Sequence, residues 1–192
     1  MNHYYEENAK QYIESTISCD MDLLYSFFEE HLPKHGTILD LGFGSGRDSL
    51  YFRKKGYEVY GVDPTISFCQ HLKDLGFVYV YPLKAQDMDF HNQFDGIWAC
   101  ASLLHVPSRE LNMVFQKCSE ALKESGILYV SFKQGKFEGE RDRRHYLDLT
   151  KEELEKYLEG TSLMMKEVLI TDDVRKDNPT KWLNVILTKT AE

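Results

Sequence analysis

The sequence predicts an α/β fold in which a mostly parallel sheet has helices on both faces. Short apolar runs alternate along the chain with helical patterns, which is typical of βαβ units. A glycine-rich loop, residues 42–46, directly follows the first apolar run, Ile38 to Leu41. The last two β-rich stretches, Leu163 to Thr171 and Trp182 to Thr188, have no helical pattern between them, so we expect them to pair as an antiparallel hairpin.

The composition is that of an ordinary globular domain. The chain has 192 residues, of which 42% are hydrophobic and 28% charged, and this length suits one domain with a sizeable core. No apolar run approaches the roughly 18 residues that span a bilayer, and residues 1–7 lack the pattern of a signal peptide. The four cysteines are scattered without a C-x-x-C pair, so we expect reduced thiols in a cytoplasmic protein and neither a disulfide framework nor a metal site.

The net charge of −8 disfavours a nucleic-acid substrate, because a generic phosphate-backbone binder needs a dense Lys and Arg surface. A basic cluster at residues 141–145 is interleaved with acidic residues. We therefore expect a small-molecule partner, with no nucleic acid and no membrane. The sequence leaves the oligomeric state open.

The first 33 residues predict two helices ahead of the first strand. Residues 4–17 place Tyr5, Tyr12 and other side chains at helical intervals. Such a helix either patches the edge of the sheet or folds over a ligand, and the flat, half-polar tyrosine rings suit a lid. Asp20 is expected to be the N-cap of a second helix, Met21 to Leu32, whose apolar stripe packs on the core.

The glycine loop predicts a cradle for a nucleotide-like ligand at the carboxyl end of the first strand. Glycine is needed where the backbone turns with positive φ or where a ligand lies against the main chain. The spacing is G-x-G-x-G, with Arg47 where the third glycine of the dinucleotide fingerprint would fall. Because that glycine permits close helix packing beneath a pyrophosphate, its absence disfavours NAD.

Asp63 is a candidate ribose ligand. It ends the predicted second strand, Tyr57 to Val62, and lies roughly twenty residues after the glycine loop, the interval expected for an acidic residue that holds a ribose diol. The same position serves NAD enzymes, and Asp63 before Pro64 also suits a simple turn former.

Further elements follow in alternation. We expect strands at Phe77 to Tyr81, Phe94 to Cys100 and Ile127 to Phe132. We expect helices at Asp48 to Lys55, at Ile66 to Leu75 with Thr65 as its cap, and at Arg109 to Leu122 with Ser108 as its cap. A further helix follows the capping box Thr150-Lys151-Glu152-Glu153 and ends at Leu158.

His105 follows the fourth strand, and its ordinary pKa near 6.5 suits a general base. A lone histidine in such a position is also a common structural or cleft-lining residue.

Residues 133–149 are not required by the generic fold. They place several basic residues directly after the carboxyl end of the fifth strand. An Arg fork there suits a carboxylate or oxyanion, and the alternative is a solvated charged loop.

The stretch Asp40-Leu41-Gly42-Phe43-Gly44-Ser45-Gly46 resembles the first motif of class I S-adenosylmethionine-dependent methyltransferases, D/E-x-G-x-G-x-G. Leu103-Leu104-His105 resembles the family's L-x-H after the fourth strand, and the terminal hairpin agrees with the family's topology. Phe132-Lys133 with residues 139–142 resembles a bacterial subgroup labelled tellurite-resistance-like. The resemblance implies a Rossmann-like, seven-stranded, mostly parallel sheet of order 3-2-1-4-5-7-6 with a C-terminal antiparallel hairpin. Residues 99–102, Ala-Cys-Ala-Ser, lack the N/D-P-P-Y/F of DNA-base methyltransferases.

The resemblance also implies site residues. Asp40 is expected near the amino group of the cofactor, Asp63 at its ribose, and Asp87 with Met88 at adenine. The full set of expected cofactor contacts is Tyr5, Tyr12, Asp40, Gly42, Gly44, Gly46, Arg47, Asp63, Pro64, Gln86, Asp87, Met88, Cys100, Ala101 and Leu104. The expected substrate contacts are Lys133, Arg141, Arg143 and Tyr146, and the candidate catalytic residue is His105.

One methyltransferase domain over residues 1–192 is the resulting expectation. It divides into an N-terminal helical lid (1–33), a cofactor-binding core (37–133), a substrate-side insertion (134–149) and a C-terminal helix with a β-hairpin (150–192). The expected activity is in-line transfer of a methyl group from S-adenosylmethionine to a nucleophilic atom of a small molecule. An NAD(P)-dependent oxidoreductase and a non-catalytic S-adenosylmethionine-binding protein remain the alternatives.

Overall fold

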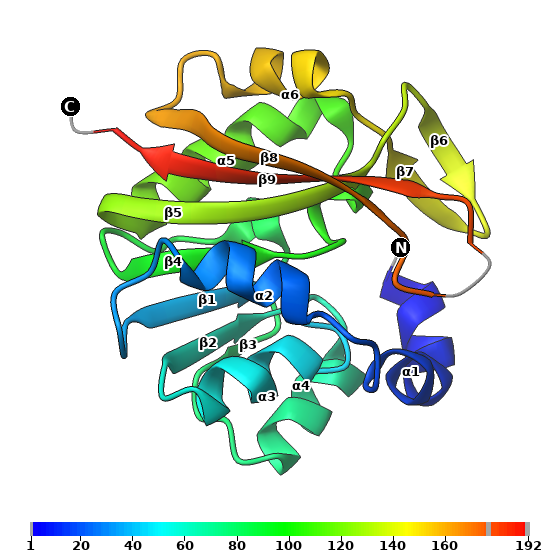
Figure 1. The fold of residues 1–192 in the computed structure, drawn as a ribbon. Coiled ribbons are helices and arrows are strands. Elements are labelled where there is room, and N and C mark those ends of the chain that lie inside the picture. Colours follow the sequence, from blue (N-terminus) through cyan, green and yellow to red (C-terminus); the bar gives the residue numbers. More distant parts are fainter. Residues whose placement is uncertain (1, 176–177, 191–192) are drawn as a thin grey trace.

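A computed structural model describes residues 2–175 and 178–190. Its main sheet has seven strands in the order β3-β2-β1-β4-β5-β9-β8, and β9 pairs antiparallel with both of its neighbours (Figure 1). The strand order predicted from the sequence is confirmed. The strand numbers differ because two further strands, β6 and β7, form a separate hairpin.

The elements have the following bounds. The strands are β1 (Thr37–Leu41), β2 (Glu58–Val62), β3 (Val80–Tyr81), β4 (Phe94–Ala99), β5 (Leu122–Lys133), β6 (Glu138–Arg141), β7 (Arg144–Leu147), β8 (Leu163–Asp172) and β9 (Lys181–Lys189). The α-helices are α1 (Asn2–Thr16), α2 (Asp22–Glu29), α3 (Arg47–Lys54), α4 (Ile66–Asp74), α5 (Ser108–Ala121) and α6 (Lys151–Leu158), and two short 3₁₀ helices are η1 (Ala85–Asp87) and η2 (Leu103–His105).

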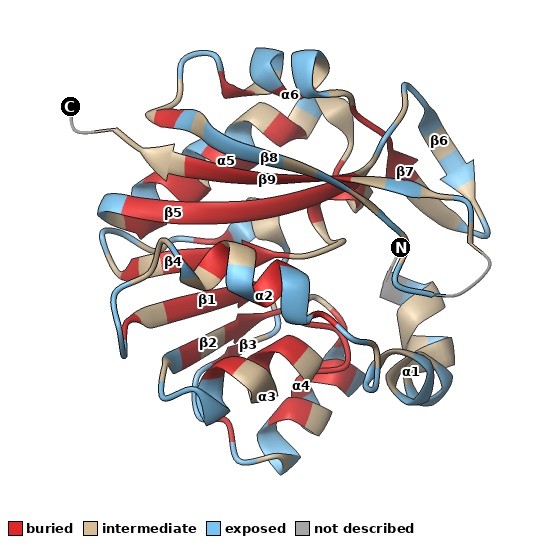
Figure 2. Cartoon of the chain, viewed as in Figure 1, coloured by how far each residue is buried: buried red, intermediate tan, exposed pale blue. Residues whose placement is uncertain are grey.

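The helices cover both faces of the sheet, and a hydrophobic core fills the space on each side (Figure 2). Phe28, Phe52 and Phe68 bring α2, α3 and α4 onto one face. Phe115 and Leu154 bring α5 and α6 onto the other. Because successive strand residues point to opposite faces, both faces of the central strands are apolar and buried, as their near-continuous hydrophobic runs predict.

α1 and the β6–β7 hairpin lie at the same edge of the sheet, where the parallel strands end (Figure 1). The hairpin is joined by Asp142 and Arg143, whose φ values of 49° and 64° are both left-handed. Such a two-residue turn matches the twist of paired strands. The charged insertion predicted here without assigned secondary structure is therefore partly a β-hairpin that stands over the carboxyl ends of the strands.

Several boundaries differ from the prediction. β3 contains only Val80 and Tyr81, since it is an edge strand and Val78 before it is 82% exposed. β5 begins at Leu122, five residues before the predicted start at Ile127. Asp20 lies one residue before the N-cap position and accepts a hydrogen bond from the Asp22 backbone N–H at 3.0 Å.

The capping predictions have mixed outcomes. The Thr150–Glu153 capping box is confirmed, with both reciprocal hydrogen bonds present. Thr65 occupies the N-cap position of α4 without a side-chain capping bond, and Ser108 is the first residue of α5 rather than its cap. In the described ranges no helix has the length and apolar character needed to cross a bilayer.

Candidate functional site

Two cavities lie side by side at the carboxyl edge of the sheet. We call them the Asp63 cavity, of about 400 Å³, and the Lys133 cavity, of about 380 Å³, after a residue that lines each one. Their shared lining residues are Tyr5, Tyr12, Gly42, Ala101 and His105. Ligand-binding crevices of open α/β sheets occur at this edge, and these volumes suit small molecules.

Asp63 presents a buried carboxylate to the first cavity. Its Oδ2 accepts the Gly44 backbone N–H at 3.1 Å, and its Oδ1 accepts the Thr65 N–H at 2.8 Å. Burial raises the pKa of Asp63, while these two N–H groups oppose the rise. Each carboxylate oxygen has two lone pairs, so each keeps acceptor capacity for a hydroxyl group in the cavity. The rest of the lining is largely apolar and includes Phe68 and Leu83.

The glycine loop is the floor between the two cavities, but its three glycines have different neighbours. A Cβ on Gly44, where φ is +52°, would lie 3.0 Å from the Tyr12 ring. A Cβ on Gly42 would meet Ser102, and one on Gly46 would meet Leu72 in the core. Gly46 therefore makes room for the packing of α4 and lines neither cavity, so its expected contact with a cofactor stays a prediction.

Helix α1 covers the glycine loop. The Glu6 carboxylate accepts hydrogen bonds from the backbone N–H groups of Ile66 and Ser67 and from the Ser67 hydroxyl, at the start of α4. A carboxylate at the N-terminus of a helix is stabilised by the free N–H groups there. On the other side of α1, Glu7 forms an ion pair of 2.9 Å with Arg143 at the tip of the hairpin.

Tyr5 joins three elements at the boundary of the two cavities. Its hydroxyl lies 3.0 Å from His105 Nε2 and accepts from Arg144 Nη1 at 3.5 Å. His105 Nδ1 lies 2.7 Å from the His145 carbonyl oxygen. Since a carbonyl can only accept, Nδ1 carries the proton, and Nε2 accepts the Tyr5 hydroxyl proton. Burial lowers the pKa of His105 to about 4, so the ring is neutral near pH 7.

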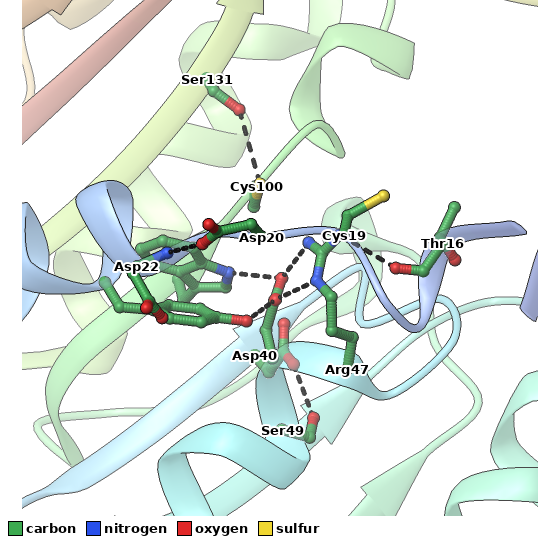
Figure 3. A network of polar contacts seen from close by, with 12 residues as sticks. Thr16, Cys19, Asp20, Asp22, Asp40, Arg47, Ser49, Cys100 and Ser131 are labelled. Carbon is green, nitrogen blue, oxygen red and sulfur yellow. Dashed lines mark hydrogen bonds and ion pairs between the residues drawn. The ribbon is translucent and has the colours of Figure 1, made fainter. Parts of the chain in front are cut away.

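A buried ionic network lies behind the glycine loop (Figure 3). The Asp48 carboxylate accepts from Arg47 Nε at 2.6 Å, from the Tyr25 hydroxyl at 2.6 Å and from Trp98 Nε1 at 2.9 Å. Asp40 accepts the Ser49 hydroxyl at 2.6 Å, and burial with the nearby Asp48 raises the pKa of Asp40. Asp40 lines neither cavity, and its expected contact with a cofactor amino group stays a prediction.

The lining of the Lys133 cavity contains four cations and four carboxylates. Its lining includes Lys133 and Arg144 beside the Tyr146 ring, with the Lys133 ammonium 4.4 Å and the Arg144 guanidinium 5.3 Å from the ring centroid. Burial and the neighbouring Arg141 lower the pKa of Lys133. Arg175 also lines the cavity, but Asp173 holds its guanidinium at 2.7 Å.

Most of the residues predicted from the sequence meet at these cavities. Those that line one or both are Tyr5, Tyr12, Gly42, Gly44, Arg47, Asp63, Pro64, Gln86, Cys100, Ala101, Leu104, His105, Lys133 and Tyr146. Asp87 is exposed and Met88 is 1% exposed within the core, and neither lines a cavity. Gln86, whose amide donates to Glu110 at 2.8 Å, faces the Asp63 cavity in their place.

Two predicted substrate contacts, Arg141 and Arg143, lie outside the cavity lining and stay predictions. Arg141 forms a bidentate pair with Asp148, at 2.9 and 2.7 Å, and Arg143 lies at the exposed tip of the hairpin. Neither lines the Lys133 cavity, whereas Arg144 does.

The sequence reasoning missed the contribution of the C-terminal hairpin. Trp182 and Asn184 of β9 line the Lys133 cavity because they pair with Lys133 and Ser131 of β5. A signal for this was available: β9 runs against β5, so the turn between β8 and β9 must lie at the carboxyl edge of the parallel strands.

In sequence, the chain is similar to known methyltransferases. Residues 38–126 match the family model described as a methyltransferase domain. YqeM of Bacillus subtilis, provisionally named a methyltransferase, is 30% identical over 133 residues, which cover 65% of this chain and 53% of that protein. The phosphoethanolamine N-methyltransferase of Plasmodium falciparum is 28% identical over 110 residues, 52% of this chain and 40% of that enzyme. The chain thus spans about half the length of these curated relatives, or less.

Solved structures share the fold over nearly the whole chain. The 1,6-didemethyltoxoflavin-N1-methyltransferase of Burkholderia thailandensis, with bound 1,6-didemethyltoxoflavin and S-adenosylhomocysteine, has a TM-score of 0.82 at 19% identity and covers 99% of this chain and 87% of its own. The (4+2)-cyclase SpnF has a TM-score of 0.78 at 16% identity, and the match covers 100% of this chain and 95% of the SpnF chain. At these identities the likeness establishes the fold alone.

Proposed function

We propose that this chain, which has the class I methyltransferase fold and matches the methyltransferase-domain model over residues 38–126, transfers a methyl group from S-adenosylmethionine to a small molecule. The observation that carries the proposal is the Asp63 carboxylate. It lies at the end of β2, is buried beside the glycine loop, and faces a cavity of about 400 Å³. A carboxylate at this point of the fold accepts the two hydroxyl protons of a ribose.

The residues of the two cavities fit the cofactor. Asp63 keeps free lone pairs for the ribose, and Phe68 with Leu83 offers an apolar space for the adenine ring. Gln86 supplies a polar group in the same cavity. The bare backbone of Gly44 leads from this cavity toward the Lys133 cavity, where the sulfonium end and the acceptor would meet.

Bound S-adenosylmethionine supplies an electrophilic methyl group whose C–S bond breaks as the acceptor's lone pair attacks, giving the thioether and, for a protonated acceptor, releasing a proton. The task of the chain is then to orient the two ligands and to exclude water. Tyr5 and Tyr12 close the site from α1, and Ala101 forms part of the wall common to both cavities.

His105 acts in this proposal as a positioning residue. Its Nε2 lone pair is engaged by the Tyr5 hydroxyl, and a pKa of about 4 makes the ring a weak base. The general base predicted from the sequence remains a prediction that requires the Tyr5 hydroxyl to move away.

The direct test is isothermal titration calorimetry with S-adenosylmethionine, S-adenosylhomocysteine and NAD⁺. We expect the first two to bind and NAD⁺ not to bind. Asp63→Asn is expected to weaken S-adenosylhomocysteine binding by about tenfold or more, because charge-assisted hydrogen bonds to the ribose are lost. Asp89→Asn is the matched control, since the Asp89 side chain is 89% exposed and lines neither cavity.

Binding of NAD⁺ without S-adenosylmethionine would overturn the proposal in favour of an oxidoreductase. Catalysis is tested separately, by mass spectrometry for S-adenosylhomocysteine formed with a panel of small acceptors. A protein that binds the cofactor but forms no product with any of them would be a non-catalytic binding protein. Membership of the tellurite-resistance-like subgroup stays a prediction from residues 132–133 and 139–142.

A further inference from the structure

We propose that the Lys133 cavity selects a small aromatic acceptor that carries an anionic group, a carboxylate or a phosphate, and that Lys133 and Arg144 hold this group. This inference rests on the proposed function, because it treats the Lys133 cavity as the acceptor site. It follows from how the charges in and around the cavity are paired.

Four carboxylates line the cavity, and all of them except Asp142 form close ion pairs with other cations. Asp48 is held by Arg47, and Asp173 by Arg175. Asp172 is paired with Lys181. These contacts leave the two cations on the hairpin side of the cavity without full compensation.

Lys133 and Arg144 are these two cations. In the described part of the chain, no carboxylate lies within 4.0 Å of the Lys133 ammonium. Arg144 reaches only the Asp142 carboxylate, at 3.9 Å, and that side chain is 84% exposed. Arg144 Nε is buried and has no hydrogen-bond partner among the described residues.

Holding two such cations near each other is unfavourable unless an anion joins them. The pKa of Lys133 is lowered by burial and by the charges of Arg141, Arg175 and Arg144. Asp148, whose charge opposes this lowering, is already bidentate to Arg141. An oxyanion between Lys133 and Arg144 would accept charge-assisted hydrogen bonds from both and remove this repulsion.

The expectation that the acceptor is aromatic comes from the aromatic rings that line the Lys133 cavity beside these cations. Both cations lie close to the Tyr146 ring, at 4.4 and 5.3 Å from its centroid, and Tyr5 and Trp182 also line the cavity. Flat rings at this position favour a planar acceptor by offset or edge-to-face contact. A cavity of about 380 Å³ limits the acceptor to a small molecule.

The test compares matched probes by calorimetry on the full chain saturated with S-adenosylhomocysteine. The probes are 4-hydroxybenzoate, phenyl phosphate and the neutral 4-hydroxybenzamide. We expect at least one anionic probe to bind about tenfold more tightly than the amide. Lys133→Met should abolish this preference, Lys133→Arg should retain it, and Lys136→Met is the matched control because Lys136 is exposed and lines neither cavity.

Three results would overturn the inference. In the first, the neutral amide binds as tightly as both anionic probes. In the second, none of the three probes binds. In the third, Lys133→Met weakens the binding of S-adenosylhomocysteine but not that of 5′-methylthioadenosine, which lacks the carboxylate. The last result would mean that Lys133 holds the cofactor's own carboxylate. If S-adenosylhomocysteine itself fails to bind the wild-type chain, the proposed function fails, and this outcome is distinct from the other three.

Discussion

Replacing Tyr5 by Phe tests the contact that closes α1 over the two cavities. The substitution keeps the ring and removes only the hydroxyl, which bonds His105 Nε2 at 3.0 Å and accepts from Arg144 at 3.5 Å. Because the His105 Nδ1 proton is committed to the His145 carbonyl, the ring cannot change tautomer without losing that bond. Tyr5→Phe therefore leaves a buried acceptor unpaired.

The expected cost follows from this geometry. The hydrogen bond contributes about 1 kcal/mol, and an unsatisfied buried acceptor costs about 1–3 kcal/mol. We expect the free energy of unfolding to fall by about 2 kcal/mol, which lowers the Tm of a chain of this size by about 4–8 °C. The affinity for S-adenosylhomocysteine should also fall, since the open arrangement of α1 becomes more populated.

A double-mutant cycle isolates the contact. Urea unfolding at pH 7.5 is measured for the wild type, Tyr5→Phe, His105→Phe and the double variant, with a coupling energy of about 1 kcal/mol or more expected between the two sites. Tyr4→Phe is the matched control, because Tyr4 lies next to Tyr5 on the same helix and packs against Arg144 through its ring. A coupling energy indistinguishable from zero would refute the reasoning about the closed helix.

Three further predictions concern the site and its support. Asp48→Asn should lower the free energy of unfolding in urea by about 3 kcal/mol or more, because it leaves a buried guanidinium unpaired; a loss no larger than that of an exposed Asp→Asn change would contradict this. Gly44→Ala should weaken S-adenosylhomocysteine binding measured by calorimetry, because its Cβ meets the Tyr12 ring, whereas Gly160→Ala, also at positive φ but with nothing within 4 Å, should leave affinity unchanged; equal affinities for both variants would argue against the close approach at the loop. Burial lowers the pKa of His105 from 6.5 to about 4, so its contribution to stability is complete above pH 6.5 and falls by up to about 3 kcal/mol as the pH drops to 4. The free energy of unfolding, measured in urea at a series of pH values in this range, should therefore depend less on pH for His105→Phe than for the wild type. An identical pH dependence in the two proteins would exclude the buried neutral ring as its cause.

The sequence alone predicted the alternation of strands and helices, the terminal hairpin and the edge of the sheet at which the two cavities lie, and the resemblance of its motifs to class I methyltransferases implied the strand order. These features depend on local patterns: an apolar run followed by a glycine loop, an acidic residue at the end of the second strand, and two β-rich stretches without a helix between them. Each pattern involves neighbouring residues, and the rules for connecting parallel strands then leave few alternative arrangements.

The tertiary structure decided which side chains of each motif face a ligand. Gly44 and Gly46 both have a positive φ, yet a Cβ on Gly44 would meet the Tyr12 ring and a Cβ on Gly46 would meet Leu72. The neighbours differ because α1 and α4 pack on different parts of the loop. Such neighbours are distant in sequence, and local spacing does not specify them.

The basic residues of the β6–β7 hairpin make the same point. Three arginines lie within four positions, but the left-handed turn at Asp142 and Arg143 carries Arg143 to the tip, and Asp148 binds Arg141. Arg144 alone of these three remains at the cavity wall. Composition indicated a basic stretch beside the site, and only the turn geometry and the pairing of charges decided which of these arginines lines the Lys133 cavity.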